Sequence, residues 1–90
     1  MDVNLKNKVA VVTGGTAGIG LATAELFARE GARVAICSSR QANVDKALKA
    51  LAGKGLNVYG ETVDVSSRQE MFAFADRVEK AFGGIDVWVS

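Results

Sequence analysis

Apolar residues form two different patterns along the chain. One is the continuous run typical of a strand buried on both faces, and the other is the spacing typical of an amphipathic helix. Nearly continuous apolar runs predict four strands, at residues 8–13, 33–38, 57–63 and 85–89. Apolar residues at helical spacing predict three helices between them, over residues 18–30, 44–51 and 67–82. The chain therefore alternates strands and helices, without a repeat or a linker.

Each predicted helix has an apolar face and a recognisable boundary. The residues expected on the inward faces are Ile19, Ala22, Thr23, Leu26 and Phe27, then Val44, Ala47, Leu48 and Leu51, and then Met71, Phe74, Ala75, Val78 and Phe82. Ser67 and Glu70 fit a capping box at the start of the third helix. Gly31 follows the first helix, where a left-handed cap favours glycine, and Gly83-Gly84 ends the third helix. Gly60 marks a weak point or a bulge in the third strand.

Strands that alternate with helices pair in parallel through right-handed crossovers. The first two helices then lie on one face of the sheet, and the third returns the chain past the first strand along the other face. The predicted fold class is α/β with strand order 3-2-1-4, the first half of a doubly wound parallel sheet. The order reverses between the first and fourth strands, and ligands of such sheets bind beyond the carboxyl ends of the strands there.

Composition narrows the possible functions. The 90 residues allow one domain, spanning 1–90, and 49% hydrophobic residues with 23% charged suit a globular chain. The net charge of +1 gives no footprint for nucleic acid and no basic patch for a membrane, and no apolar run is long enough to span one. Residues 1–6 lack a signal-peptide pattern, and the single Cys37 forms no intrachain disulfide, so a cytoplasmic location is expected. Without histidine, the chain supplies no His-activated nucleophile and no His-ligated metal.

The most informative segment joins the first predicted strand to the first predicted helix. It reads TGGTAGIG over residues 13–20. A helix N-terminus there offers unpaired N–H groups and about half a positive charge to a diphosphate. Glycines let the backbone approach phosphate oxygens and adopt a positive φ, and Gly20 would let the helix pack tightly on the first strand. A tight strand-to-helix turn without a ligand is the alternative.

The glycine spacing, Gly14-x-x-x-Gly18-x-Gly20, differs from the general dinucleotide fingerprint. It resembles the Thr-Gly-x-x-x-Gly-[Ile/Leu]-Gly motif of the short-chain dehydrogenase/reductase family. Asp64-Val65 resembles the family's adenine-contacting pair, and GGIDVWVS over residues 83–90 resembles the approach to its fourth-strand motif. The three motifs occur in the expected order along the whole chain. The resemblance implies a Rossmann fold that binds a nicotinamide dinucleotide.

The resemblance also implies roles for individual residues. Those that would line the pyrophosphate are Gly14, Gly18, Ile19 and Gly20. Those that would lie near the adenosine ribose are Thr16 and Ala17. The Asp64 carboxylate would accept a hydrogen bond from the adenine amino group, with the Val65 backbone beside it. An ordinary turn residue at a strand end is the alternative for Asp64.

Residues after the second predicted strand bear on the choice of cofactor. NAD-binding sheets place an acidic residue there to hold the ribose 2′-hydroxyl, and that position falls on Ser38. Ser38 and Ser39 remove repulsion against a 2′-phosphate, and the Arg40 guanidinium supplies donors for it, so NADP(H) is favoured. A solvated loop arginine is the alternative for Arg40. NAD(H) stays open, because many NADP-dependent relatives have a basic residue where this chain has Ala17.

No catalytic residue is assigned in this chain. The family transfers hydride with a serine, a tyrosine and a lysine, the last two four residues apart. The only tyrosine, Tyr59, is followed four residues later by Val63 and precedes the fourth strand. Residues 1–90 are therefore expected to be the cofactor-binding part of a longer, homo-oligomeric reductase acting on a small-molecule carbonyl or secondary alcohol, for example a 3-oxoacyl thioester.

Two other functions remain open. One is a stand-alone, non-catalytic dinucleotide-binding module, and the other is a structural piece that binds no ligand. In the reading as part of a reductase, the 90 residues alone are expected to be inactive, and unstable or oligomeric, because the fourth strand is an open edge.

The remaining conspicuous side chains favour structural roles. Cys37 is expected to be a buried apolar residue rather than a reactive thiol. Phe72 is expected in the core or against a neighbour, and Trp88 in packing rather than in cofactor stacking. The lysines expected on a solvated helix face are Lys46, Lys49 and Lys54.

Overall fold

The computed structural model describes residues 5–90. Residues 1–4, which form most of the segment judged for a signal peptide, lie outside the described part. The elements in chain order are β1 (Val9–Thr13), α1 (Gly18–Arg29), β2 (Arg33–Ser38), α2 (Gln41–Ala52), β3 (Tyr59–Thr62), α3 (Arg68–Phe82) and β4 (Val87–Val89). Every predicted element is present, although β3 and β4 begin two residues later than predicted.

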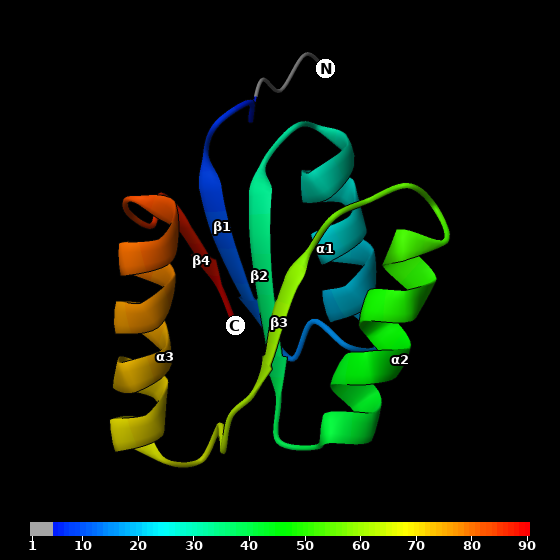
Figure 1. Ribbon diagram of the computed structural model, residues 1–90. Coiled ribbons are helices and arrows are strands. Elements are labelled where there is room, and N and C mark those ends of the chain that lie inside the picture. Colours follow the sequence, from blue (N-terminus) through cyan, green and yellow to red (C-terminus); the bar gives the residue numbers. More distant parts are fainter. Residues whose placement is uncertain (1–4) are drawn as a thin grey trace.

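The four strands form one parallel sheet in the order β3-β2-β1-β4, which confirms the predicted topology (Figure 1). β1 pairs on one side with β2, where Val9 lies opposite Arg33, and on the other with β4, where Ala10 lies opposite Val87. Asp86 fixes β4 to β1, because its Oδ2 accepts the Val9 N–H at 2.8 Å and its own N–H donates to the Val9 carbonyl at 2.8 Å.

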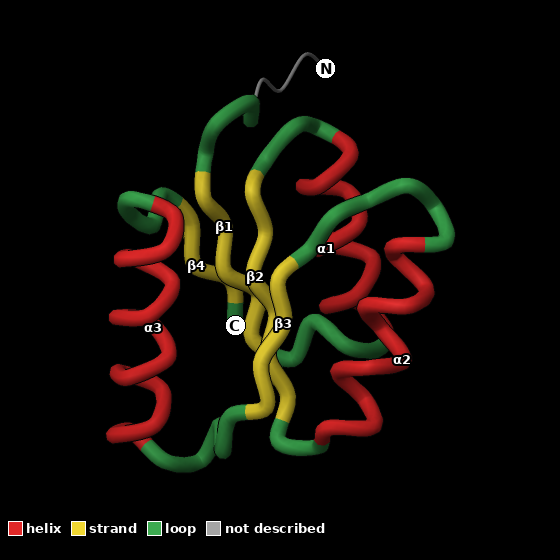
Figure 2. The backbone as a smooth tube through the Cα atoms, in the orientation of Figure 1, coloured by secondary structure: helices red, strands yellow, loops and turns green. Residues whose placement is uncertain are grey.

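α1 and α2 cover one face of the sheet and α3 covers the other, as Figures 1 and 2 show. The buried cluster on the α1 and α2 face contains Ala10, Val12, Ala24, Ala32, Val34, Ile36, Ala47 and Leu51. The cluster on the α3 face contains Val9, Val11, Ala35, Cys37, Val63, Phe74 and Val78. Successive residues of β1 and β2 enter opposite clusters, as a strand buried on both faces requires.

α1 packs on a different side from the one predicted. Ile19 and Leu26 are 87% and 55% exposed, and Ala22 is exposed as well. Ala24 is buried instead, and Phe27 is partly buried against the same cluster. The prediction of an inward face over Ile19, Ala22 and Leu26 was therefore wrong. The side that meets the sheet carries Ala24, with Leu21 and Ala28 partly buried beside it.

Gly60 serves close packing and does not form a bulge. β3 pairs with β2 without interruption, and Gly60 lies opposite Ile36 in the regular register. A Cβ atom on Gly60 would lie 3.0 Å from Leu48 and 3.0 Å from Val44 of α2. The bulge was therefore a wrong prediction, and the glycine makes room for α2 against the edge strand.

The boundaries of α3 follow the sequence signals closely. The Ser67 hydroxyl accepts the Glu70 N–H at 3.2 Å, as a capping box requires. The Glu70 carboxylate does not return to the Ser67 N–H, and it accepts the Asp64 N–H at 3.1 Å instead. Gly83 ends the helix with φ 85°, and its N–H donates to the Glu79 carbonyl at 2.8 Å. α3 is thus closed by side chains at its start and by a left-handed glycine at its end.

Two aromatic residues test the remaining predictions about packing. Phe72 is 69% exposed on α3, so of its two expected places the core is excluded and contact with a neighbour stays a prediction. Trp88 is 41% exposed and contacts Phe74 edge-to-face, with ring centroids 6.5 Å apart, which agrees with a packing role. Among the helices of residues 5–90, none has the length and apolar character that a bilayer span needs.

Candidate functional site

The loop between β1 and α1 has the backbone conformation that its glycines predict. Gly14 has φ 68° and Gly18 has φ 56°, both in the left-handed region that favours glycine. The Gly14 N–H donates to the Cys37 carbonyl at 3.2 Å, which fixes the start of the loop against the end of β2. The loop therefore begins at the carboxyl ends of two adjacent central strands.

Two further glycines are required by space rather than by φ. A Cβ atom on Gly20 would lie far inside van der Waals contact with the Gly14 carbonyl oxygen. The tight approach that Gly20 allows is thus to Gly14, the residue that directly follows β1. A Cβ atom on Gly15 would lie 2.6 Å from Cγ2 of Ile36.

The amino termini of α1 and α2 lack side-chain caps. The N-cap residues, Ala17 and Arg40, make no capping hydrogen bond, and neither first turn holds an acidic residue. In α1 the first bond of the helix runs from the Leu21 N–H to the Ala17 carbonyl at 3.2 Å. The earlier N–H groups of the first turn, including that of Ile19, are left for another acceptor. An anion is the complement of this geometry and of the helix dipole.

A depression of about 390 Å³ lies at the carboxyl ends of β1 and β2, beside Val65 of the segment that follows β3. Its lining residues are Thr13, Gly14, Ser38, Ser39, Arg40, Asn43 and Val65. The Val65 N–H donates to the Ser39 hydroxyl at 3.3 Å, and the Arg40 N–H donates to the Ser38 hydroxyl at 3.4 Å. The structure therefore brings together predicted residues from the glycine loop, from the end of β2 and from the Asp64-Val65 pair.

A second depression, of about 310 Å³, lies between the glycine loop and α2. Its lining residues are Thr16, Ala17, Gly18, Leu21, Asn43, Lys46, Ala47 and Ala50. Asn43 lines both depressions, so they adjoin along the start of α2. Sequence analysis missed Asn43 and treated Lys46 as solvated. Their spacing of three from Arg40, on a helix that begins at the end of β2, was the available signal.

Three of the predicted residues line neither depression. Gly20 lies beneath the loop, against Gly14, and Ile19 is 87% exposed on α1. Asp64 follows β3, and its Oδ1 accepts the Ser66 hydroxyl at 2.6 Å and the Ser66 N–H at 3.0 Å. These bonds lower the pKa of Asp64 below its ordinary value. The carboxylate is therefore ionised at neutral pH and is held in a turn.

Cys37 behaves as the sequence predicts. Its side chain is fully buried in the cluster on the α3 face. Burial raises the pKa of the Cys37 thiol, because the thiolate would lose its solvation. The residue is therefore a packing residue at the end of β2.

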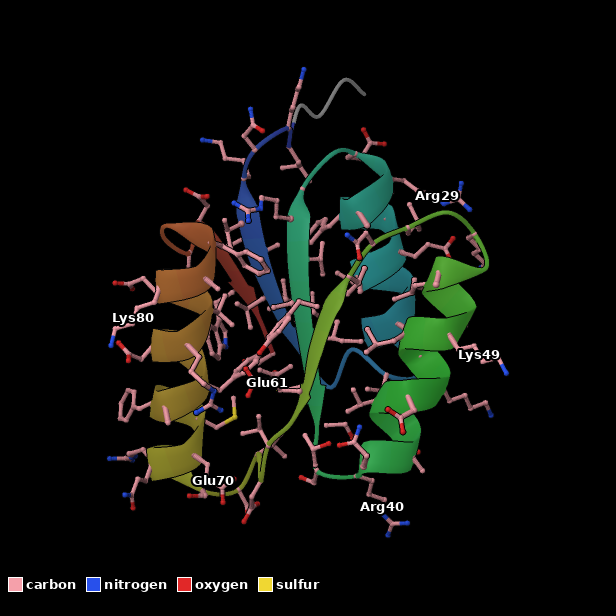
Figure 3. The ribbon with its side chains drawn as sticks, in the orientation of Figure 1. Arg29, Arg40, Lys49, Glu61, Glu70 and Lys80 are labelled. Atoms are coloured by element: carbon pink, nitrogen blue, oxygen red, sulfur yellow. The ribbon has the colours of Figure 1, made fainter. Side chains whose placement is uncertain are left out.

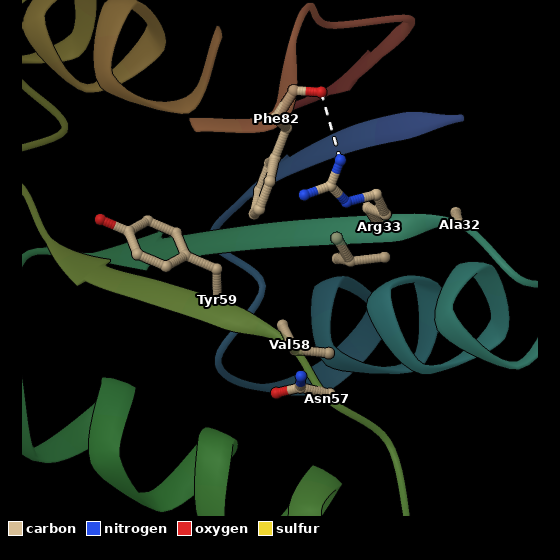
Figure 4. A pocket seen from close by; sticks show the side chains of 7 residues that line it. Ala32, Arg33, Asn57, Val58, Tyr59 and Phe82 are labelled. Carbon is tan, nitrogen blue, oxygen red and sulfur yellow. Dashed lines mark hydrogen bonds between the residues drawn. The ribbon is translucent and has the colours of Figure 1, made fainter. Parts of the chain in front are cut away.

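A third depression, of about 370 Å³, lies at the other end of the sheet, where β2 and β3 begin (Figure 4). Arg33 stacks on the Phe82 ring at 4.5 Å and donates from Nη1 to the Phe82 carbonyl at 3.3 Å. Tyr59 meets the Phe82 ring edge-to-face at 5.9 Å. The Arg33 guanidinium is thus already engaged by the Phe82 ring and carbonyl. This depression also lacks residues of the glycine loop and of the helix amino termini, so it is not part of the candidate site. The two adjoining depressions form the candidate site.

Comparison with known proteins agrees with this geometry. The family model described as short chain dehydrogenase matches residues 8–90. Dehydrogenase/reductase SDR family member 4 of Oryctolagus cuniculus is 44% identical over 86 residues, which is 96% of this chain and 33% of that relative. Its SDR name is that of the family whose motifs the sequence resembles.

Two solved structures show the same arrangement of elements. 2-Keto-3-deoxy-D-gluconate dehydrogenase from Streptococcus agalactiae superposes with a TM-score of 0.90 at 33% identity, covering 94% of this chain and 32% of that one. L-Sorbose reductase from Gluconobacter frateurii, solved with NADPH and L-sorbose, gives a TM-score of 0.87 at 38% identity, covering 98% and 34%. The chain spans about a third of the length of these relatives.

Proposed function

The chain belongs to the short-chain dehydrogenase family, whose model matches residues 8–90, and on this premise we propose that it is the cofactor-binding part of an NADP(H)-dependent oxidoreductase. The reaction is reversible hydride transfer between the cofactor and a small carbonyl or secondary alcohol. The observation that carries the proposal is the amino terminus of α1. It has no side-chain cap, and two glycines of positive φ, Gly14 and Gly18, form the loop that leads into it.

The loop fits a dinucleotide at its diphosphate. The unpaired N–H groups of the first turn of α1 would bind the pyrophosphate, and the absence of side chains at Gly14 and Gly18 leaves room for its oxygens. The adenosine ribose would lie near Thr16 and Ala17. The adenine would lie against Val65, with the Asp64 carboxylate as the acceptor for its amino group.

The end of β2 supports NADP(H) over NAD(H). Ser38 and Ser39 line the depression beside Arg40, and no acidic residue is among the lining residues. A carboxylate there would bind a 2′-hydroxyl and repel a 2′-phosphate. The side chain of Arg40 makes no interaction within residues 5–90, so its guanidinium is available to a phosphate. The NADPH complex of the sorbose reductase lends further support.

The bound nicotinamide would supply the hydride, and the residues of this chain would hold and orient the dinucleotide. The proton-transfer groups would come from outside residues 1–90. Tyr59 is unsuited to that role, because it begins β3 at the end of the sheet away from the glycine loop, and its hydroxyl donates to Glu61 Oε2 at 2.5 Å. We therefore expect the 90 residues alone to bind cofactor at most, without turnover.

The test is a calorimetric titration of the full-length protein that contains this chain with NADP⁺ and NAD⁺. We expect NADP⁺ to bind more tightly, and Arg40→Ala to reduce that preference by about 10- to 100-fold, the range for a hydrogen bond to a charged group. Binding of neither dinucleotide would overturn the proposed function. Binding without turnover on any carbonyl or alcohol would favour a non-catalytic dinucleotide-binding module.

A further inference from the structure

α2 carries three side chains of matching chemistry along the side that meets the candidate site. Arg40 is its N-cap residue, and Asn43 and Lys46 follow at intervals of three. Arg40 lines the depression at the end of β2, Lys46 lines the depression beside the glycine loop, and Asn43 lines both. Six residues of helix span about 9 Å, a distance that two long basic side chains can close around one anion.

We propose that Lys46 is a second cationic ligand of the cofactor 2′-phosphate, opposite Arg40, with the Asn43 amide donating between them. This inference rests on the proposed function and deepens it. Lys46 would supply, from α2, the positive charge that the glycine loop lacks at Ala17, since Ala17 lines the same depression as Lys46. The preference for NADP(H) then depends on two cations rather than on Arg40 alone.

The charges around Lys46 leave it available for a phosphate. No acidic side chain within residues 5–90 forms an ion pair with Lys46. Its neighbour Asp45 instead accepts a hydrogen bond from Gln41 Nε2 at 2.7 Å. Glu25, the acidic residue within α1, forms ion pairs with Lys54 at 2.5 Å and with Arg29 at 3.1 Å, and not with Lys46.

The side chain of Asn43 is also unengaged. Its backbone N–H donates to the Arg40 carbonyl at 3.1 Å, and its side-chain amide has no partner within residues 5–90. An amide offers two N–H donors, which can hydrogen-bond to phosphate oxygens. Two cationic side chains and one neutral amide therefore offer hydrogen-bond donors along the two adjoining depressions.

Lys49 provides an internal comparison, because it lies one further interval of three along α2. Figure 3 shows its side chain pointing away from the sheet, and it lines neither depression. The expectation of a solvated lysine face thus fits Lys49. Lys46 is exposed as well, as expected, but it also lines the depression beside the loop.

The experiment measures dissociation constants for NADP⁺ and NAD⁺ by calorimetry, using the full-length protein and its Lys46→Ala and Lys49→Ala variants. Loss of one partly solvated phosphate contact should weaken NADP⁺ binding by about tenfold and leave NAD⁺ binding within about twofold. Lys49→Ala should change neither constant. Ala17→Arg added to Lys46→Ala should restore most of the NADP⁺ affinity, which a merely structural effect of Lys46 would not allow.

Three other outcomes would each contradict a different part of the proposal. Equal weakening of NADP⁺ and NAD⁺ by Lys46→Ala would place the lysine at the shared pyrophosphate and overturn the assignment to the 2′-phosphate. An unchanged NADP⁺ constant would overturn any binding role for Lys46. If the unmodified protein bound neither dinucleotide, the proposed function itself would fall, and the inference with it.

Discussion

The start of α3 and the starts of α1 and α2 meet the same physical requirement in opposite ways. At α3 the Ser67 hydroxyl accepts the Glu70 N–H at 3.2 Å, and Glu70 places a carboxylate in the first turn. At α1 and α2 the N-cap residues Ala17 and Arg40 make no side-chain bond, and neither first turn is acidic. All three helix starts carry a partial positive charge, and only that of α3 is neutralised by residues of the described chain.

The position of each helix start explains the difference. α1 and α2 begin beside the two adjoining depressions at the carboxyl ends of β1 and β2. α3 packs on the opposite face, where its Phe74 and Val78 fill the second buried cluster. A helix that serves packing gains stability from its own cap, whereas a helix that binds an anion must keep its first N–H groups free.

Gly20→Ala should weaken cofactor binding more than any other single substitution in the glycine loop or at the helix starts. The added Cβ would collide with the Gly14 carbonyl, which is backbone and can move only if the loop moves. We expect NADP⁺ affinity to fall by at least about 100-fold, or about 2.7 kcal/mol, together with a lower melting temperature. Calorimetric titration and thermal unfolding of the full-length variant measure the two effects.

Gly83→Ala is the matched control on the α3 side. Gly83 also has a positive φ, 85°, but a Cβ atom there would meet open space. The variant should lose about 1 kcal/mol of unfolding free energy and keep its NADP⁺ affinity. If Gly83→Ala weakened NADP⁺ as much as Gly20→Ala does, the loss would reflect general destabilisation rather than the loop.

The second effect is a reversal of cofactor preference by Ser38→Asp. The carboxylate would stand at the end of β2, next to Arg40, where it can accept the 2′-hydroxyl of NAD⁺ and repel a 2′-phosphate. We expect the ratio of NADP⁺ to NAD⁺ affinity to fall by about 30-fold or more. Steady-state KM values for both cofactors provide the ratio. An unchanged ratio would contradict the placement of the 2′-phosphate in this depression.

The third effect lies wholly on the closed helix. Ser67→Ala removes the side-chain acceptor of the Glu70 N–H and should lower the unfolding free energy by about 1 kcal/mol. The dissociation constant for NADP⁺ should not change, because α3 starts outside both depressions. Urea unfolding with and without NADP⁺ measures both quantities, and a weaker constant would contradict the separation between the two kinds of helix start.

The smallest effect is a dependence of stability on pH. Burial opposes ionisation of Glu61, but hydrogen bonds from Arg77, at 2.7 and 2.9 Å, and from Tyr59 outweigh it and lower its pKa. Because the folded pKa is depressed, the stabilisation is present above the ordinary value of 4.5 and is lost as pH falls through the folded value. Glu61→Gln should therefore flatten the acid limb of stability in urea unfolding between about pH 6 and pH 3. An equally steep limb in the variant would contradict this.

Sequence analysis predicted the strand order and the boundaries of α3 because those signals are local or follow from chirality. Ser67 and Gly83 carry their conformations in their own chemistry, and the right-handed crossovers leave one strand order. The face of α1 was wrong, because small residues such as Ala24 support close packing as well as large ones do. Hydrophobicity alone cannot distinguish these two sides of the helix.

The candidate site was predicted in part for a similar reason. Gly14, Ser38 and Arg40 belong to recognisable segments, and the structure brings them to one depression. Asn43 and Lys46 lie on a helix whose rotation about its axis depends on tertiary packing, in particular the contact with Gly60. The sequence pattern gives the spacing of Asn43 and Lys46, but it does not show that their side of α2 faces the candidate site.

Hydrogen exchange with and without NADP⁺ distinguishes the open helix starts from the capped one, because it follows the backbone N–H groups of both. In the full-length protein, we expect saturating NADP⁺ to slow exchange strongly in peptides that cover residues 14–20. Peptides that cover residues 67–71 should be unchanged, because the Glu70 and Met71 N–H groups already donate to Ser67, and the Ser67 N–H donates to the Asp64 carbonyl. Unchanged exchange over residues 14–20 with cofactor bound would contradict the account.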